Sequence, residues 1–391
     1  MKIKVKKRNL DAALQCTTLA VGGNEDASMT SYYLIRHNLS TGATSMLTQD
    51  GKRLVAESPI QECTVETDAT GEWDGFMVPG WRVRLWLGAI DDGEEMLTLE
   101  RLPDHSIKVS AKRGSGKFGS LNWKDFPFWD TTRAEAKLVT TMGAAHLTNI
   151  LSYAKKFVSD QEGRTPGIVA AECVEGVLKA TDAVGVISIT SPKLKNSTLR
   201  IHGKDIPPVL SFLSLVGDGE VDILEHKRML FIQRTGTGVQ IGASRWIHDF
   251  PSLGSLVVDE STPSMASFRV NKADLLKAMT YLLAFAKKDD GDISFRFDDP
   301  NIILSMRSGS GSADAEEQTL PCIESTNMDV LHADGRTGFK LTKRYIESIA
   351  TTFTEDTMLF RVDVTKKNGY VSFYHNRDGD SYYTCIVWVK Q

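Results

Sequence analysis

The sequence predicts an α+β protein made of three diverged copies of one unit of about 130 residues. The triplet at residues 125–127, Asp-Phe-Pro, recurs 124 residues later at 249–251, and a Gly-rich turn with a basic residue precedes each triplet. The apolar and lysine pattern of residues 147–156 recurs at 279–288, with an offset of 132. Echoes at this spacing indicate repeated domains rather than repeated short motifs.

Each copy is predicted to run strand, helix, strands, helix, strands. Residues 5–14 match residues 270–279 at a constant offset of 265, so the first and third copies both open on a strand followed by a helix. In the third copy Leu275, Met279 and Leu282 recur at the spacing of one apolar helix face. The apolar positions of a second helix in each copy are Val83, Leu85, Trp86 and Ile90, then Val209, Leu210, Leu213 and Val216, then Tyr345, Ile346, Ile349 and Phe353.

Short polar segments at 131–136 and 259–265 are expected to separate the copies. The predicted domains are therefore residues 1–133, 134–262 and 263–391. The low-complexity segment 307–314 is expected to be a flexible hairpin loop, and the alternative is that it touches a partner.

The composition is that of a soluble globular protein. Of 391 residues, 41% are hydrophobic and 25% charged, and no apolar run approaches the length of a membrane helix. Residues 1–15 alternate basic and apolar side chains and lack the apolar stretch of a secretory signal, so a cytoplasmic location without membrane attachment is expected. The five cysteines form no C-x-x-C pair and are expected to be reduced and mostly buried. Because the histidines are equally dispersed, no metal site and no cofactor is expected.

The sequence gives no sign of catalysis. It contains no G-x-S-x-G elbow and no H-E-x-x-H. The fragment 114–117, Gly-Ser-Gly-Lys, is similar to part of a phosphate-binding loop, but Ala111 stands where the first glycine of that motif belongs. A hairpin turn is the better interpretation. We therefore expect a protein that is not an enzyme.

Positive charge is concentrated on the predicted helices. They sum to about +8, whereas the whole chain carries −4, so the rest of the chain carries about −12. Basic side chains repeated over several helices are suited to neutralising phosphates without reading bases, although ordinary solvated helix faces remain the alternative. The candidate DNA-contacting residues are Arg8, Arg82, Arg84, Lys155, Lys156, Arg164, Lys272, Lys277, Lys287, Lys288 and Lys343.

The chain resembles the bacterial DNA polymerase III beta subunit, the DNA sliding clamp, along nearly its whole length. The order of several short stretches carries the resemblance, since no single motif suffices. These stretches are Val78-Pro79 before a helix, residues 112–127 ending in Asp-Phe-Pro, and residues 178–182, 249–251, 273–277, 338–339 and 386–389.

The resemblance implies a ring made by a head-to-tail homodimer of three-domain subunits, with helices lining a hole around double-stranded DNA. It also implies a processivity factor that binds a replicative DNA polymerase, a clamp loader and other proteins carrying clamp-binding motifs. Phe285 and Ala286 at a helix end are the implied dimer contacts, and the alternative is that Phe285 belongs to the core.

In the family, short peptides of these partners enter a groove between the second and third domains. The implied groove residues are Thr181, Val184, Val186, Pro251, Leu256, Arg344, Trp388 and Val389. Residues 183–185, Ala-Val-Gly, replace the usual Gly-His-Arg, the C-terminal tail differs, and Asn24 stands where a basic residue is expected. These departures fit a divergent member of the family, such as a phage-encoded one. The alternative function is a clamp-fold scaffold for protein interaction that does not encircle DNA.

Overall fold

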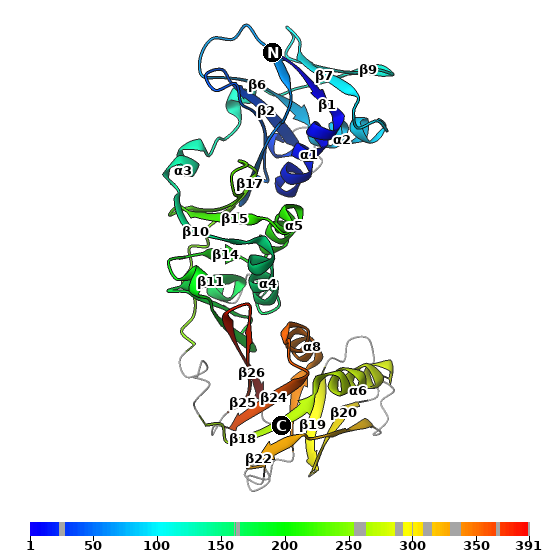
Figure 1. Cartoon of the computed structure of the whole chain (residues 1–391), viewed down its shortest axis with the longest axis vertical. Helices are drawn as coiled ribbons and strands as arrows, with labels where there is room; N and C mark the ends of the chain where they lie inside the picture. Colours follow the sequence, from blue (N-terminus) through cyan, green and yellow to red (C-terminus); the bar gives the residue numbers. More distant parts are fainter. Residues whose placement is uncertain are drawn as a thin grey trace. The chain divides into compact units, whose positions relative to one another are not determined.

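The structure is a computed structural model that describes residues 1–22, 28–159, 161, 165–253, 263–285, 292–298, 300–307, 315–328, 338–364 and 368–389 (Figure 1). The chain divides into two compact units. One comprises residues 1–149 and 199–246, and the other comprises residues 150–198 and 247–391. Helix α4 (Ala144–Lys155) begins in the first unit and ends in the second.

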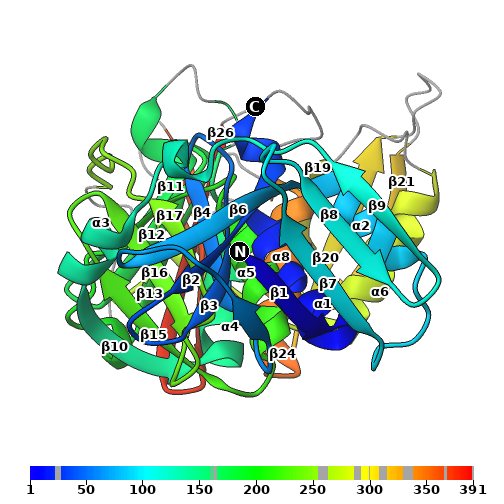
Figure 2. The same cartoon turned by 90° about the horizontal axis from the view of Figure 1, so that it is seen from above.

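The first unit contains two antiparallel sheets. The five-stranded sheet has the order β5 (Thr64–Glu66), β1 (Lys2–Lys6), β7 (Met96–Arg101), β8 (Ile107–Ala111) and β9 (Gly114–Phe118), and Figure 2 shows β7, β8 and β9 side by side. The eight-stranded sheet has the order β10 (Lys137–Gly143), β15 (Glu220–Glu225), β16 (Met229–Arg234), β17 (Gln240–Ser244), β4 (Leu54–Pro59), β3 (Thr44–Gln49), β2 (Tyr32–Asn38) and β6 (Trp73–Pro79). The remaining elements are α1 (Lys7–Thr17), η1 (Thr18–Ala20), η2 (Met29–Ser31), α2 (Gly80–Gly88), η3 (Trp123–Asp125), α3 (Asp130–Glu135), β14 (Arg200–His202) and α5 (Ile206–Val216).

The second unit is also built on antiparallel sheets. In the larger one the strands follow the order β11 (Ala170–Val174), β12 (Val177–Thr181), β13 (Gly185–Thr190), β26 (Asp380–Val389), β25 (Asn368–Arg377), β24 (Thr357–Val364), β18 (Ala266–Asn271) and β22 (Glu324–Thr326). The four-stranded sheet has the order β21 (Ala315–Pro321), β20 (Asn301–Arg307), β19 (Asp292–Asp298) and β23 (Gly338–Thr342). The other elements are η4 (Pro166–Val169), η5 (Pro192–Leu194), α6 (Lys272–Phe285) and α8 (Lys343–Thr352).

The predicted α+β class is confirmed, and local sequence patterns explain the first elements. Alternation along β1 buries Ile3 and Val5 on one face of the strand. Helix α1 buries Leu10 and Leu14, which lie one turn apart. These side chains share one core with the apolar face of α2 and with β7. The sheet and its helices therefore bury their apolar faces against each other.

The repeat is visible in the backbone at the start of three helices. The N–H groups of Lys7, Ala144 and Lys272 each donate to a carbonyl in the turn before a later strand, at 2.9, 2.9 and 2.8 Å. The offset of 265 between the first and third copies is confirmed, because it also separates Lys7 from Lys272. The offset of 132 between the second and third copies is wrong, since the helix starts lie 128 residues apart. A shift of four residues is about one helical turn, which leaves the apolar face unchanged.

Two other expectations need correction, and a third segment has a structure that the sequence did not predict. Leu85 does not belong to the buried face of its helix, because its side chain is 66% exposed whereas Val83 and Leu87 are buried. The Gly-rich fragment 114–117 is not the turn itself but lies in strand β9, and Lys112 with Arg113 connects it to β8. Most of segment 131–136 is helix α3, and the domain boundary expected there stays a prediction.

The remaining sequence predictions concern the hairpins, the cysteines and membrane-spanning helices. The turn between β16 and β17 contains Gly236 and Gly238, both with positive φ, so the second predicted hairpin is confirmed. Arg307 pairs with Ala315, so the ends of the low-complexity segment belong to one hairpin, while residues 308–314 lie outside the described chain. The five cysteines are free thiols, three of them buried. Among the described helices none is long and apolar enough to span a membrane.

Candidate functional site

The loop between β12 and β13 forms one rim of the predicted peptide groove. The Asp182 carboxylate accepts hydrogen bonds from the backbone N–H groups of Val184, at 3.1 Å, and Gly185, at 2.8 Å. The Thr181 hydroxyl donates to the Gly185 carbonyl at 2.8 Å and accepts from the Ala183 N–H at 3.1 Å. These bonds hold Ala183 at a φ of 76°, a conformation that is uncommon for residues other than glycine. The loop therefore has one fixed shape, and it exposes Val184, whose side chain is 43% accessible.

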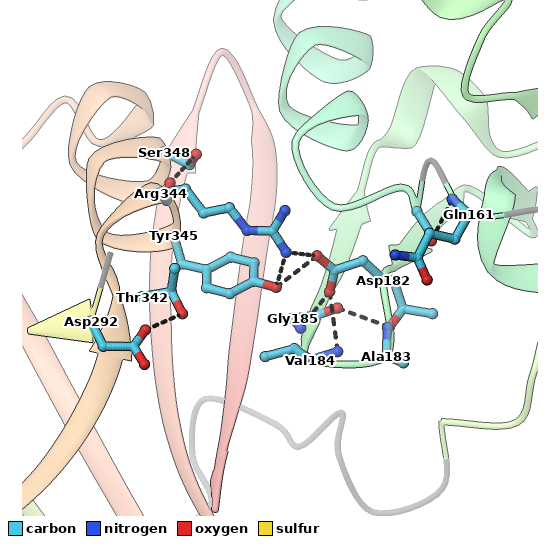
Figure 3. Close-up of polar contacts among 12 residues, drawn as sticks. Gln161, Asp182, Ala183, Val184, Gly185, Asp292, Thr342, Arg344, Tyr345 and Ser348 are labelled. Carbon is cyan, nitrogen blue, oxygen red and sulfur yellow. Dashed lines mark hydrogen bonds and ion pairs between the residues drawn. The ribbon is translucent and has the colours of Figure 1, made fainter. Parts of the chain in front are cut away.

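Helix α8 fastens this loop through Asp182, as Figure 3 shows. The Tyr345 hydroxyl donates to Asp182 Oδ2 at 2.6 Å, and the Arg344 guanidinium donates to the same oxygen. The guanidinium also stands over the Tyr345 ring, 4.6 Å from its centroid. Burial and the hydrogen bond to a carboxylate both raise the pKa of Tyr345, so the phenol stays protonated and remains a donor.

An aromatic stack fills the space beneath the loop. The Phe157 ring packs on the Tyr345 ring with 5.5 Å between centroids. A Cβ atom at Gly185 would stand 2.7 Å from Phe157 and 2.8 Å from Tyr345, which leaves no room for a side chain. The stack therefore requires glycine at this position.

The wall beside the loop is made by β13 and the C-terminal strand β26. Val186 pairs with Cys385 in the ladder, and both side chains form a small buried cluster with Tyr383. Leu253, Tyr370 and Tyr374 pack against this cluster. The Val387 N–H donates to the Val184 carbonyl at 2.9 Å, so the described backbone of the two strands continues to the rim.

The structure brings some of the predicted groove residues together and places others elsewhere. Four of them gather around the rim: Arg344, Thr181, Val184 and Val186. Of these, Thr181 and Val186 are buried, so they support the wall rather than line it. Pro251 lines a cavity of about 530 Å³ over β11 and β12, which Leu253 also lines. Trp388 and Val389 end β26, but their side chains, like Leu256, lie outside what the structure describes.

Most predicted DNA-contacting residues lie on helices and several make intramolecular contacts. Arg8 pairs with Glu94 and with Glu62, the latter at 3.6 Å. Lys343 pairs with Glu347 one turn along α8 at 3.3 Å. Such exposed pairs contribute little to stability and leave the cations accessible to another anion.

Other cations donate to carbonyl or hydroxyl oxygens of the chain. Lys156 contacts the Ser348 carbonyl at 3.4 Å and the Thr351 hydroxyl at 3.1 Å. Lys272 donates to the Phe353 carbonyl at 3.0 Å, and Arg84 donates to the Gly80 carbonyl at 3.3 Å.

Two groups of candidates remain. Arg82 stacks over Trp81 at 5.0 Å, Lys155 is half-buried at the end of α4, and Lys277 is exposed on α6. Four candidates lie outside the described residues: Arg164, Lys287, Lys288 and the dimer candidate Ala286. The side chain of the other dimer candidate, Phe285, also lies outside them.

Sequence reasoning missed the roles of Phe157 and Tyr345. Tyr345 was assigned to the apolar face of its helix, where its ring does lie, but its hydroxyl bonds the rim loop. The only signal in the sequence is a tyrosine on the apolar face of a helix. The hydroxyl of a buried tyrosine usually has a hydrogen-bond partner. Within the described ranges, no group of three or more His, Cys, Asp or Glu side chains is placed to hold a metal.

Comparison with known proteins gives a fold but no close relative. No protein-family model matches the sequence, and no curated protein is significantly similar to it. Solved structures, in contrast, match over the whole chain. A DNA polymerase sliding clamp from Bacillus subtilis has a TM-score of 0.80 at 13% identity, covering 100% of this chain and 99% of that chain. The beta subunit from the DNA polymerase of Streptococcus pyogenes has a TM-score of 0.79 at 11% identity, covering 100% of both chains.

The chain has the fold of the bacterial DNA sliding clamp. A sliding clamp from Bartonella birtlesii, solved bound to griselimycin, has the same fold, with a TM-score of 0.78 at 16% identity over 100% of both chains. The predicted fold is thus confirmed, at an identity so low that the chain is a divergent example of it.

In this clamp fold the altered rim has a structural cause. Residues 183–185 stand where the resemblance places Gly-His-Arg, and Gly185 takes the place of the arginine. The Phe157–Tyr345 stack occupies the space that a side chain there would need. The only cation that the described residues place on Asp182 at this rim is Arg344, which comes from α8 rather than from the loop.

Proposed function

We propose that this chain is a DNA sliding clamp, a non-enzymatic processivity factor that encircles duplex DNA and tethers a replicative polymerase. The single observation that carries the proposal is the likeness to solved sliding clamps over the full length of both chains.

The charge of the helices supports contact with DNA. Helices α1, α2, α4, α5, α6 and α8 carry nine Lys or Arg against three Asp or Glu, in a chain whose net charge is −4. Contacts of this kind neutralise phosphates without reading sequence, so they hold DNA weakly and permit sliding. Closure of a ring around the duplex then prevents escape.

The rim of β13 and β26 is the proposed docking site for partner peptides. It offers the exposed apolar side chain of Val184 beside the charged tip of Arg344, and the buried cluster around Val186 supports the wall behind them. This combination suits a short peptide with hydrophobic anchors. The partners we propose are a replicative polymerase, a clamp loader and other proteins with clamp-binding motifs, acting in the cytoplasm.

One observation favours the alternative function, a clamp-fold scaffold that does not encircle DNA. Several candidate cations already contact groups of this chain, namely Arg8, Lys156, Lys272 and Lys343. If those contacts were their only role, the helices would carry less free positive charge than the sequence suggests.

Retention on closed circular DNA separates the two functions. The assay loads the protein with its cognate loader, then compares retention on circular and linearised plasmid. We expect retention on the circle only, and loss of at least tenfold in the variant Arg84→Glu/Lys155→Glu/Lys277→Glu, because phosphate neutralisation is lost. The matched control Lys193→Glu/Lys195→Glu/Lys227→Glu reverses exposed lysines that lie outside the α-helices and is expected to behave as the wild type. A dimer never retained on circular DNA would favour the scaffold.

A further inference from the structure

A cavity of about 500 Å³ lies in the first unit, where α5 packs beside α1 and η1 (Figure 1). One wall comes from α1 and η1, the second from the end of α2, and the third from α5. The lining residues of the first wall run from Lys7 to Leu19. At 1.5 Å per residue the cavity therefore extends about 18 Å along that helix.

The second unit contains an equivalent helix pair, the end of α4 and α8. An offset of 137 residues separates the starts of α1 and α4, and the same offset separates the starts of α5 and α8. The buried positions agree with this offset, since Val209 and Leu213 of α5 correspond to Ile346 and Ala350 of α8. The two helix pairs can therefore be compared residue by residue.

In the second unit, side chains fill the space between the paired helices. Lys156 reaches from the end of α4 to the Ser348 carbonyl at 3.4 Å and to the Thr351 hydroxyl at 3.1 Å. The rings of Phe157 and Tyr345 stack with 5.5 Å between their centroids. A long polar side chain and two aromatic rings thus close this pair of helices.

The first unit leaves the same space open because its side chains are smaller. The positions equivalent to the lysine and the two aromatic residues hold Leu19, Ala20 and Pro208. Leu19 is shorter than a lysine and has no polar tip that could bond α5. On the other walls Ser211 is exposed, and a Cβ added at Gly88 would meet nothing within 4 Å. The cavity is therefore the space that the second unit fills with its own side chains.

Most of the exposed lining of the cavity is apolar. Leu14 and Leu87 are buried and Leu19 is half-buried, whereas Leu215 on α5 is 46% exposed. The residue equivalent to Leu215 in the second unit is Thr352, which is buried. An apolar group bound in the cavity would remove the exposed leucine surface from water, which is favourable.

Charged side chains from α1 and α2 also line the cavity. Lys7 donates to Asp11 one turn along α1 at 2.5 Å, and their side chains are only 15% and 34% exposed. Arg84 from α2 is a second cation, so the lining carries two cations against one carboxylate. Because the site is partly shielded from water, this excess positive charge attracts an anion more strongly than it would in bulk water.

We propose that this cavity binds a small amphipathic anion, a molecule with one acid group on an apolar body. The apolar body lies between Leu19 and Leu215, and the acid group faces Arg84, with Lys7 as the second cation. The volume of about 500 Å³ is that of a small-molecule site. A bound anion would also occupy Arg84, one of the proposed DNA contacts, and this consequence alone rests on the proposed function.

Fluorescence titration of the full chain with 1-anilinonaphthalene-8-sulfonate tests the site, because this amphipathic anion emits strongly in apolar surroundings. Gly88→Leu and Ser211→Phe fill the cavity from two walls, and each is expected to raise the dissociation constant about tenfold or more. The control Gly119→Leu changes an exposed glycine outside the cavity, where an added Cβ also meets nothing within 4 Å, and is expected to change nothing.

Unchanged binding in both filling variants, with their native circular dichroism retained, would overturn the site. Gly88→Leu is expected to fold, because leucine is more favourable than glycine in a helix. The titration contains no DNA, so its failure would leave the proposed function untouched.

The charge of the ligand is tested with N-phenyl-1-naphthylamine, which has the same apolar body without the sulfonate. Arg84→Gln is expected to weaken binding of the sulfonate probe about tenfold and to leave binding of the neutral probe unchanged. The control Arg82→Gln removes a neighbouring cation that does not line the cavity, and both probes are expected to bind it as they bind the wild type. An equal effect of Arg84→Gln on both probes, or no effect on either, would overturn the assignment of an anion.

The comparison with the second unit has its own test. Leu19→Lys places a lysine at the position equivalent to Lys156, where it is expected to reach the Ser211 carbonyl and close the cavity. The neutral probe, which is indifferent to the added charge, is then expected to bind about tenfold more weakly. Binding as tight as in the wild type would contradict the equivalence of the two helix pairs.

Discussion

Gly185 is the position at which packing most tightly constrains the proposed partner groove. The change Gly185→Ala adds one methyl group 2.7 Å from Phe157 Cδ1 and 2.8 Å from Tyr345 Cε1. Ordinary carbon contacts are about 3.5–4.0 Å, so the rings would have to move by roughly 1 Å. Both rings are almost fully buried and stacked on each other, which leaves them no free volume.

The expected cost follows from these distances. Forcing a methyl group into a well-packed core costs about 1–3 kcal/mol. Displacing Tyr345 would also lengthen its 2.6 Å hydrogen bond to Asp182, which contributes about 1 kcal/mol or more because the acceptor is charged. We therefore expect Gly185→Ala to lower the free energy of unfolding by about 2–4 kcal/mol.

Urea unfolding followed by tryptophan fluorescence and circular dichroism measures this change. The matched control is Gly143→Ala at the end of β10, where an added Cβ meets nothing within 4 Å. A double-mutant cycle with Phe157→Leu is expected to show that the smaller side chain recovers at least 1 kcal/mol of the alanine cost, because the two changes share one space (about 0.5–3 kcal/mol for residues in contact). If Gly185→Ala and Gly143→Ala lose the same stability, the steric argument for glycine at the rim is wrong.

Further predictions concern buried ionisable groups. Burial, with Arg377 nearby, lowers the pKa of His375 to about 4 from 6.5. Below pH 6.5 the imidazole of His375 gains a proton in the unfolded state but not in the folded state. The free energy of unfolding therefore falls by about 2 kcal/mol as pH falls toward 4. His375→Phe is expected to remove that loss when urea unfolding is compared at pH 7 and 4.5, and an unchanged pH dependence would contradict it. Burial raises the pKa of Asp205 to about 6 despite its ion pair with Arg53 at 2.9 Å. As pH rises from about 4 to 6, the carboxyl loses its proton more readily in the unfolded state, which lowers the free energy of unfolding. Asp205→Asn is therefore expected to have a free energy of unfolding about 1–2 kcal/mol above that of the wild type at pH 8, and no higher at pH 4. Burial also raises the pKa of the Cys16 thiol to about 12, so in native protein it is expected to react with a maleimide far more slowly than Cys63; comparable rates, resolved by peptide mass spectrometry, would refute this.

The sequence by itself determined the repeated elements. Period-2 alternation in β1 and the apolar spacing of α6 are local patterns, and the structure has a strand and a helix where they predict them. The order of short motifs along the chain was sufficient to indicate the clamp fold. Periodicity could not fix the offset of the second copy, because a shift of one helical turn keeps the same face apolar.

Only the tertiary structure decided how these elements meet. The pairing of β17 with β4 and of β26 with β13 joins residues more than 180 positions apart, and no local pattern specifies which strand edges will meet. The same holds for the rim, where Phe157, Tyr345 and Asp182 come together from three distant segments. Whether Leu85 is buried or exposed depends on what packs over its helix, and that is fixed by long-range contacts rather than by the helix itself.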